Sequence, residues 1–124
     1  MPLESHIDPV LGLVTTRLEG RITGSEVKAH QIGLEADPDF DPDFDHLFDL
    51  SRVEKFQVSV EQVRAIASVS VFSPSSRRAV VAPEDVLYGL SRMYEGFRDI
   101  SEEKIRVFRS REEALTWLAD EGNR

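Results

Sequence analysis

One acidic residue interrupts an apolar run and is the first candidate for chemistry. Asp49 stands within residues 46–50, His-Leu-Phe-Asp-Leu, which have the composition of a buried strand. A carboxylate is costly to bury unless it pairs with a cation or accepts hydrogen bonds, and Arg52, Arg78 and Arg92 are candidate partners. Two interpretations follow. Asp49 is either a structural acid that holds the next loop or part of a polar site at the strand's carboxyl end with Ser51, Arg52 and Arg78.

A second candidate is a row of large side chains at helical spacing. Tyr88, Met93, Tyr94 and Phe97 belong to a wide apolar stripe over residues 86–97. Aromatic and methionine side chains adapt to apolar ligands and partner proteins, so this stripe could line a ligand groove or an interface. It could equally pack in the core. An enzyme that uses Asp49, Tyr88 and Arg92 is a further interpretation.

Several chemistries lack the residues that they need. The chain has no cysteine, which excludes disulfides, thiolate metal sites and a cysteine nucleophile. His6, His30 and His46 are far apart and form no metal-ligand spacing, so we expect surface or half-buried histidines. No Gly-x-Ser-x-Gly or Walker motif occurs. The sequence therefore predicts a protein that is not an enzyme and has no resident metal or cofactor.

Acidic residues are concentrated in one segment. The net charge is −8, and six acids with no base among them stand between Glu35 and Asp45. An EF-hand loop needs Gly at its sixth position and Glu at its twelfth. Starting from Asp37 these positions are Pro42 and Phe48, so the segment is predicted to be a solvated loop, anchored by Phe40 and Phe44.

Charge and hydropathy also limit the partners and the compartment. No extended basic surface is present, which argues against a nucleic-acid partner. The longest apolar run, residues 79–83, is far shorter than the roughly 20 residues of a membrane span, and no targeting segment is visible. We therefore predict one domain over residues 1–124, in the cytoplasm. A homodimer is possible through an edge strand or the apolar stripe.

Local signals predict strands that alternate with helices. Strands are expected at residues 3–7 and 11–18, with a turn at Gly20, and then at 46–50, 77–82 and 104–108, the last at an edge. Capping boxes at Thr23, Ser59 and Ser110 begin three helices, and Pro83 begins another. The order β-β-α-β-α-β-α-β-α predicts an α/β fold with a mainly parallel sheet and four helices. Ligands usually bind beyond the carboxyl ends of such strands.

The sequence resembles the SpoIIAA-like branch of the STAS superfamily, also described as STAS/SEC14-type domains. The resemblance spans nearly the whole chain and agrees with the predicted element order. It depends on the joint order of several segments, none of which is diagnostic alone. These segments are Asp37-Pro38-Asp39-Phe40, Leu47-Phe48-Asp49-Leu50-Ser51-Arg52-Val53, Arg78-Ala79-Val80-Val81-Ala82, residues 88–94, Val107-Phe108-Arg109 and residues 113–118.

The resemblance implies a function. Such domains act as anti-sigma factor antagonists that bind a kinase and are switched by phosphorylation of a serine at the start of the second helix. Ser59 is the counterpart here, although residues 57–60 lack the Asp, the second hydroxyl residue and the Gly of that motif. The capping box alone also explains Ser59. We therefore predict a non-enzymatic regulatory module with an anti-sigma or kinase-like protein partner. The alternative is a carrier of a lipid-like apolar ligand between helices and sheet.

Overall fold

The computed structural model describes residues 3–69, 71–98 and 104–120 of the chain. Within these residues the elements follow the predicted order, with one antiparallel strand pair at the start. The strands are β1 (Leu3–Asp8), β2 (Leu13–Thr23), β3 (Asp45–Gln57), β4 (Arg77–Val81) and β5 (Lys104–Phe108). The helices are α1 (Gly24–Ala36), α2 (Val60–Ala67), α3 (Asp85–Arg98) and α4 (Arg111–Ala119).

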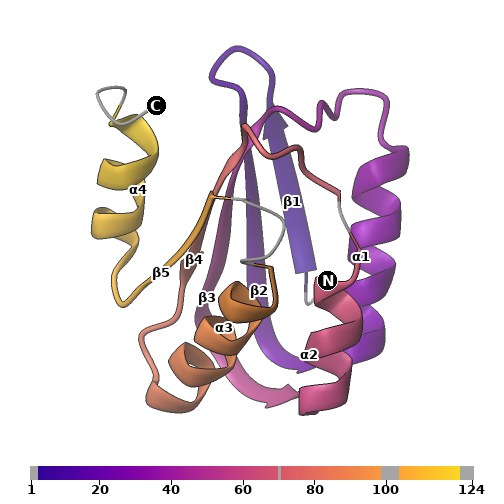
Figure 1. Ribbon diagram of the computed structural model, residues 1–124, viewed down its shortest axis with the longest axis vertical. Coiled ribbons are helices and arrows are strands. Elements are labelled where there is room, and N and C mark those ends of the chain that lie inside the picture. The colour runs from indigo at the N-terminus through magenta and orange to yellow at the C-terminus, as the bar shows by residue number, and fades with distance from the viewer. Residues whose placement is uncertain (1–2, 70, 99–103, 121–124) are drawn as a thin grey trace.

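The strands form one sheet in the order β1-β2-β3-β4-β5 (Figure 1). β1 and β2 are antiparallel, and the other neighbouring pairs are parallel. Each parallel pair is joined through a helix, as parallel connections require. β5 lies at an edge, as predicted, and β1 forms the opposite edge.

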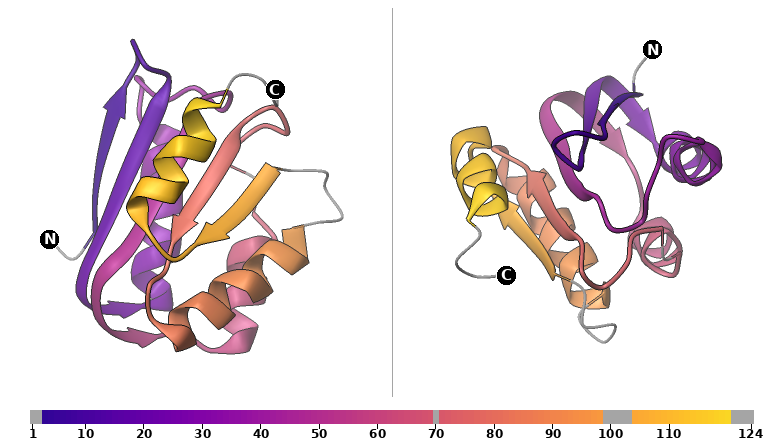
Figure 2. Two further views of the ribbon diagram at one scale, coloured as in Figure 1. Left: turned by 90° about the vertical axis from the view of Figure 1, so that its left-hand side faces the viewer. Right: turned by 90° about the horizontal axis from the view of Figure 1, so that it is seen from above.

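The helices form two unequal layers. α1, α2 and α3 cover one face of the sheet, and α4 lies on the other (Figure 2). The period of two along a strand explains how β4 serves both layers. Ala79 and Val81 pack with Ala114 and Leu118 of α4, whereas Val80 belongs to the core cluster on the opposite face. This accounts for the uninterrupted burial of β4.

β2 and β3 extend further than predicted. β3 continues to Gln57 and not to residue 50, and β2 runs past Gly20 to Thr23. The predicted turn at Gly20 is wrong because the chain makes register shifts there and stays paired with β3. Gly20 has φ of +74°, which glycine adopts at bulges without steric cost.

Helix starts follow the predicted caps in three cases. The side chains of Thr23, Ser59 and Ser110 each accept a backbone N–H from the residue three positions on. Pro83 does not begin α3, which starts at Asp85. The amide of Ala82, directly after β4, still donates to the carbonyl of Phe108 in β5 (2.8 Å), so the backbone remains paired with β5 up to the residue before Pro83.

The acidic segment is folded by its own carboxylates. Asp37 and Asp41 each accept the amide of the residue two positions on (2.9 Å), and Asp43 accepts the hydroxyls of Ser73 and Ser75. These hydroxyls lower the pKa of Asp43. Phe40 and Phe44 pack against the core, as predicted. Within residues 3–69, 71–98 and 104–120, no cluster of three or more potential metal ligands occurs.

α4 is attached to the sheet through a buried cation. The side chain of Arg77 is 1% exposed, and its Nη1 donates to the carbonyls of Trp117 and Asp120, both at 2.7 Å. The guanidinium also lies 5.3 Å from the centroid of the Trp117 ring. Arg77 thus binds two carbonyls at the C-terminal end of α4, and that of Trp117 also accepts the amide of Asp120 (3.3 Å). In the part of the chain described, no helix has the length and hydropathy needed to cross a membrane.

Candidate functional site

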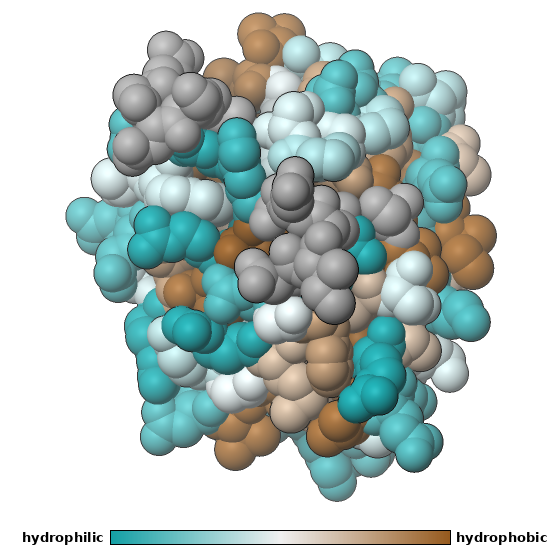
Figure 3. Space-filling model, viewed as in Figure 1, coloured by the Kyte–Doolittle hydropathy of each residue, from teal (hydrophilic) through white to brown (hydrophobic). Residues whose placement is uncertain are grey.

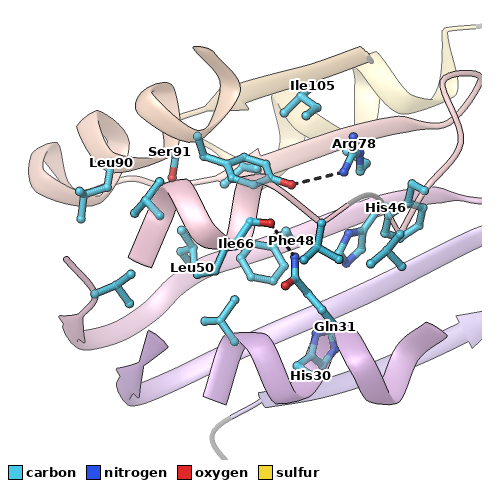
Figure 4. A pocket seen from close by; sticks show the side chains of 18 of the residues that line it. His30, Gln31, His46, Phe48, Leu50, Ile66, Arg78, Leu90, Ser91 and Ile105 are labelled. Atoms are coloured by element: carbon cyan, nitrogen blue, oxygen red, sulfur yellow. Dashed lines mark hydrogen bonds between the residues drawn. The ribbon is translucent and has the colours of Figure 1, made fainter. Parts of the chain in front are cut away.

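A largely apolar cavity of about 110 Å³ lies between the sheet and the three-helix layer (Figure 4). α1, α2 and α3 supply one wall, and β3, β4 and β5 supply the other. Most of the lining is aliphatic or aromatic. The lining residues are Val27, His30, Gln31, Leu34, His46, Phe48, Leu50, Phe56, Val58, Val63, Ile66, Val69, Val71, Phe72, Arg78, Val80, Leu90, Ser91, Tyr94 and Ile105.

Polar groups gather at one end of this cavity. Arg78 is 6% exposed, and its Nη1 donates to the hydroxyl of Tyr94 on α3 (3.3 Å). His46 faces the same side because it is directly opposite Arg78 in the register of β3 and β4. Phe72 contacts both groups. The imidazole of His46 stacks on it with centroids 4.8 Å apart, and the guanidinium of Arg78 lies 5.5 Å from its centroid.

A hydrogen-bonded chain connects the cavity with the outer strands. His46 Nε2 lies 2.8 Å from the hydroxyl of Thr16, which lies 2.9 Å from the hydroxyl of Ser5. Ser5 in turn is hydrogen-bonded to Nε2 of His30 on α1. Burial is the main cause that lowers the pKa of His46 to about 3, with His30 and Arg78 adding to it. His46 is therefore neutral at physiological pH. Burial also lowers the pKa of His30.

One further polar side chain lines the middle of the cavity. Gln31 of α1 donates through Nε2 to the carbonyl of Ile66 on α2 (3.4 Å), as Figure 4 shows. Its Oε1 is buried and has no hydrogen-bond partner among the described residues. A buried acceptor of this kind is uncommon and calls for a donor from water or a ligand.

The polar site predicted around Asp49 is divided between the two faces of the sheet. Asp49 points toward α4, where Arg111 Nη1 approaches its carboxylate at 3.6 Å, whereas Arg78 lines the cavity on the other face. The Oδ1 of Asp49 accepts the amide (2.9 Å) and hydroxyl (2.6 Å) of Ser51. Arg52 is exposed on the extension of β3. Asp49 and Arg78 therefore do not converge, and Arg111 takes the place of the predicted partners.

The predicted apolar stripe of α3 is also divided. Of its four proposed site residues only Tyr94 lines the cavity. Tyr88 packs against the core, and the guanidinium of Arg109 lies over its ring, 4.0 Å from the centroid. Phe97 lies under Arg64, whose guanidinium is 5.1 Å from its centroid, and Met93 is half-buried. Arg92 pairs with Glu95 (3.0 Å). Asp49 lies beside Arg111 of α4, whereas Tyr88 packs against the core on the opposite face of the sheet, so these two residues do not meet.

His46, His30, Gln31, Phe72 and Ser91 were not predicted as cavity residues. The expectation of surface or half-buried histidines is wrong for His46, which is 8% exposed. A signal was present in the sequence: His46 and Arg78 are polar residues at the amino-terminal ends of two apolar strands. The cavity's polar end therefore lies near the amino ends of β3 and β4, and not beyond the carboxyl ends, where ligands were expected.

Ser59 is exposed at the N-cap of α2 and is engaged in a complete capping box. Its hydroxyl accepts the amide of Gln62 (3.1 Å), and its own amide donates to Gln62 Oε1 (2.9 Å). The adjacent Val60 is 47% exposed. The cap explains why a serine stands here, and the hydroxyl remains at the surface.

Replacing Ser59 with alanine is expected to lower the free energy of unfolding by about 1 kcal/mol, because the amide of Gln62 loses its acceptor. Ser59→Asp retains a capping oxygen and is expected to keep the wild-type stability. Urea unfolding of both variants measures the effect. Ser25→Ala, at an exposed helical position, serves as the control. Equal stability of Ser59→Ala and wild type would show that the cap contributes nothing.

The surface has separate hydrophobic patches among hydrophilic residues (Figure 3). One lies at the top of the view, over the turn between β1 and β2. Val10 and Leu11 in this turn are 93% and 72% exposed. The carboxylate of Asp8 accepts hydrogen bonds from both of their amides, at 3.0 and 3.1 Å, and these bonds stabilise the turn.

Comparison with known proteins supports the fold. No family model matches the chain, and no curated protein matches it. Among solved structures, the chain is similar to an uncharacterised protein of the DUF3478 family from Shewanella loihica PV-4, whose crystal structure has a SpoIIAA-like fold. The TM-score is 0.59 at 14% identity, over 94% of this chain and 92% of that one. The chain therefore has a SpoIIAA-like fold, as the resemblance in its sequence predicted.

Proposed function

We propose that the protein is a non-enzymatic binding module that holds a small, mainly apolar molecule between the sheet and helices α1 to α3. The cavity carries this proposal. Ligand sites in proteins are typically apolar hollows with a few converging polar groups. Here an apolar lining is combined with Arg78, Tyr94, His46 and Gln31.

The volume of the cavity limits the size of the ligand. An apolar cavity of roughly 150 Å³ is known to hold benzene. At about 110 Å³, this cavity fits a short chain of about five carbons better than a phospholipid. The proposal thus narrows the lipid-like alternative to a small molecule or to one short acyl end of a larger one.

The buried acceptor of Gln31 supports occupancy by something other than hydrocarbon. Leaving such a group without a donor typically costs about 1–3 kcal/mol. A ligand hydroxyl or a water molecule beside the ligand would satisfy Oε1 of Gln31, which is buried within the lining.

A cavity-filling variant tests the proposed function. Ser91 is 7% exposed on α3 and lines the cavity, so Ser91→Leu should occupy the space of the ligand. We expect 1-pentanol to bind to wild type, as measured by saturation-transfer NMR, and its affinity to fall at least about tenfold in Ser91→Leu, as a leucine side chain displaces the ligand from its apolar contacts.

Ser25→Leu introduces the same side chain at an exposed position of α1 and is the matched control. It should bind 1-pentanol like wild type. Absence of saturable binding to wild type, or equal binding to Ser91→Leu and Ser25→Leu, would refute a ligand site in this cavity. Circular dichroism of both variants checks that they fold.

A second proposal retains a regulatory contact at the start of α2. Its support is the exposed hydroxyl of Ser59 beside the exposed side chain of Val60. A phosphate on Ser59 would meet the amides and the positive end of the helix dipole. Incubation with an anti-sigma-type kinase, followed by mass spectrometry, tests the switch. A Ser59 that stays unmodified while a known antagonist substrate is phosphorylated would count against it.

A further inference from the structure

We infer that the molecule bound in the cavity is a neutral hydrogen-bond donor with a short apolar chain, of the class of aliphatic alcohols, and that Oε1 of Gln31 accepts the hydrogen bond from its hydroxyl. This inference rests on the proposed function and names the class of ligand. Its basis is a buried acceptor within a mainly apolar lining. Gln31 is then the residue that selects an alcohol over a molecule of similar shape that has no donor.

The carbonyl of Ile66 fixes the orientation of the Gln31 amide. A backbone carbonyl only accepts hydrogen bonds, so the end of the amide that faces it, at 3.4 Å, is the nitrogen Nε2 (Figure 4). The other end is the oxygen Oε1, which is buried and has no hydrogen-bond partner in the part of the chain that the structure describes. The unsatisfied atom is therefore an acceptor, and the group that satisfies it must be a donor.

The residues one helical turn before and after Gln31 are apolar. They are Val27 and Leu34, and both line the cavity with it. A buried water molecule typically has about three polar partners, and these two side chains supply none. An alcohol needs one acceptor for its hydroxyl, while its carbon chain packs against the aliphatic side chains. The surroundings of Oε1 thus suit an alcohol better than an isolated water molecule.

The lining also favours a donor without charge. An ammonium group would donate to Oε1 of Gln31 as well, but a buried charge is costly unless an opposite charge pairs with it. Among the described residues that line the cavity, none is an aspartate or a glutamate. The amide oxygen of Gln31 carries no net charge and cannot replace a carboxylate. A hydroxyl group supplies the donor without this cost.

A pair of isomers tests the inference on the unmodified protein. 1-Pentanol and butyl methyl ether consist of the same atoms, but only the alcohol has a proton on its oxygen. We expect wild type to bind 1-pentanol at least about fivefold more tightly than the ether, because the ether leaves Oε1 of Gln31 without a donor. Affinities are measured by NMR titration at pH 7.

Gln31→Met tests whether this preference depends on Gln31. Methionine keeps the length of the side chain and removes the acceptor, so the two probes should bind to this variant within about twofold of each other. Ser91→Ala is the matched control, because it removes the hydroxyl of another polar lining residue, on α3. It should keep the preference for 1-pentanol. A preference that survives in Gln31→Met, or that is lost in Ser91→Ala alone, would overturn the role of Gln31.

The outcomes separate this inference from the proposed function. Equal affinities of 1-pentanol and butyl methyl ether for wild type would overturn the inference and leave the proposed function standing. Failure of both probes to bind would overturn the two together. Circular dichroism checks that the variants fold. Should Gln31→Met not fold, the comparison of the two probes in wild type and in Ser91→Ala still decides.

Discussion

Lowering the pH from 6.5 toward 3 is expected to destabilise the protein strongly through His46. Burial, together with His30 and Arg78, lowers the pKa of this residue from 6.5 to about 3 in the folded state. Below pH 6.5 the unfolded chain therefore binds a proton that the folded chain excludes. The stability is fully present above pH 6.5 and falls by up to about 1.4 kcal/mol for each pH unit until the folded pKa is reached.

The range between pH 6.5 and 5 separates the histidines from the carboxylates, most of which remain ionised there. His30, whose pKa is also lowered by burial, adds to the loss, so the comparison with His46→Gln assigns the part that is due to His46. Urea unfolding should show a loss of about 2 kcal/mol for wild type over this range. His46→Gln, which can still bond to Thr16, should lose much less. His6→Gln removes an exposed imidazole and is the control. Parallel pH profiles for wild type and His46→Gln would contradict the assignment.

Replacing Arg77 with methionine is expected to cost about 3 kcal/mol of stability. Arg77 is fully enclosed, and its Nη1 satisfies two carbonyls at the end of α4. Hydrogen bonds from a charged group contribute about 1.5–3 kcal/mol each, and the substitution removes both of these. Methionine retains the length of the side chain, so the effect should come from the lost hydrogen bonds and not from a cavity.

Arg106→Met is the matched control. Arg106 lies on the neighbouring strand β5 and is exposed, and its guanidinium is 5.7 Å from the centroid of the same Trp117 ring. We expect it to change the free energy of unfolding by less than about 1 kcal/mol. Amide hydrogen exchange should show earlier opening of α4 in Arg77→Met alone. Equal effects of the two substitutions would show that the ring contact, and not the carbonyl bonds, holds α4.

The fold could be predicted because its signals are local. The caps at Thr23, Ser59 and Ser110 mark helix starts in the sequence itself, and the apolar run of β4 indicates a strand covered on both faces. The errors occurred where tertiary pairing overrides a local signal. Gly20 was predicted to form a turn. Its left-handed conformation instead belongs to a bulge, and β2 stays paired with β3.

The candidate site could be predicted only in fragments, because it depends on which face each strand residue occupies. Asp49 and Arg78 are both polar residues in buried strands, but the register places them on opposite faces. Tyr94 was identified from the apolar stripe of α3. Gln31 gave no recognisable motif, and the only signal for His46 was its position as a polar residue at the amino-terminal end of an apolar strand. Volume left between well-packed layers is a property of the assembled side chains, and no local pattern encodes it.

The most direct measurement of ligand binding in this cavity is a residue-resolved titration of wild type with 1-pentanol, followed by ¹H–¹⁵N chemical shifts. The account predicts saturable shifts at cavity residues of α1, α2 and α3, including Gln31, Ile66 and Ser91, and none at Leu118 of α4 on the other face. Shifts that do not saturate, or that centre on α4, would contradict it.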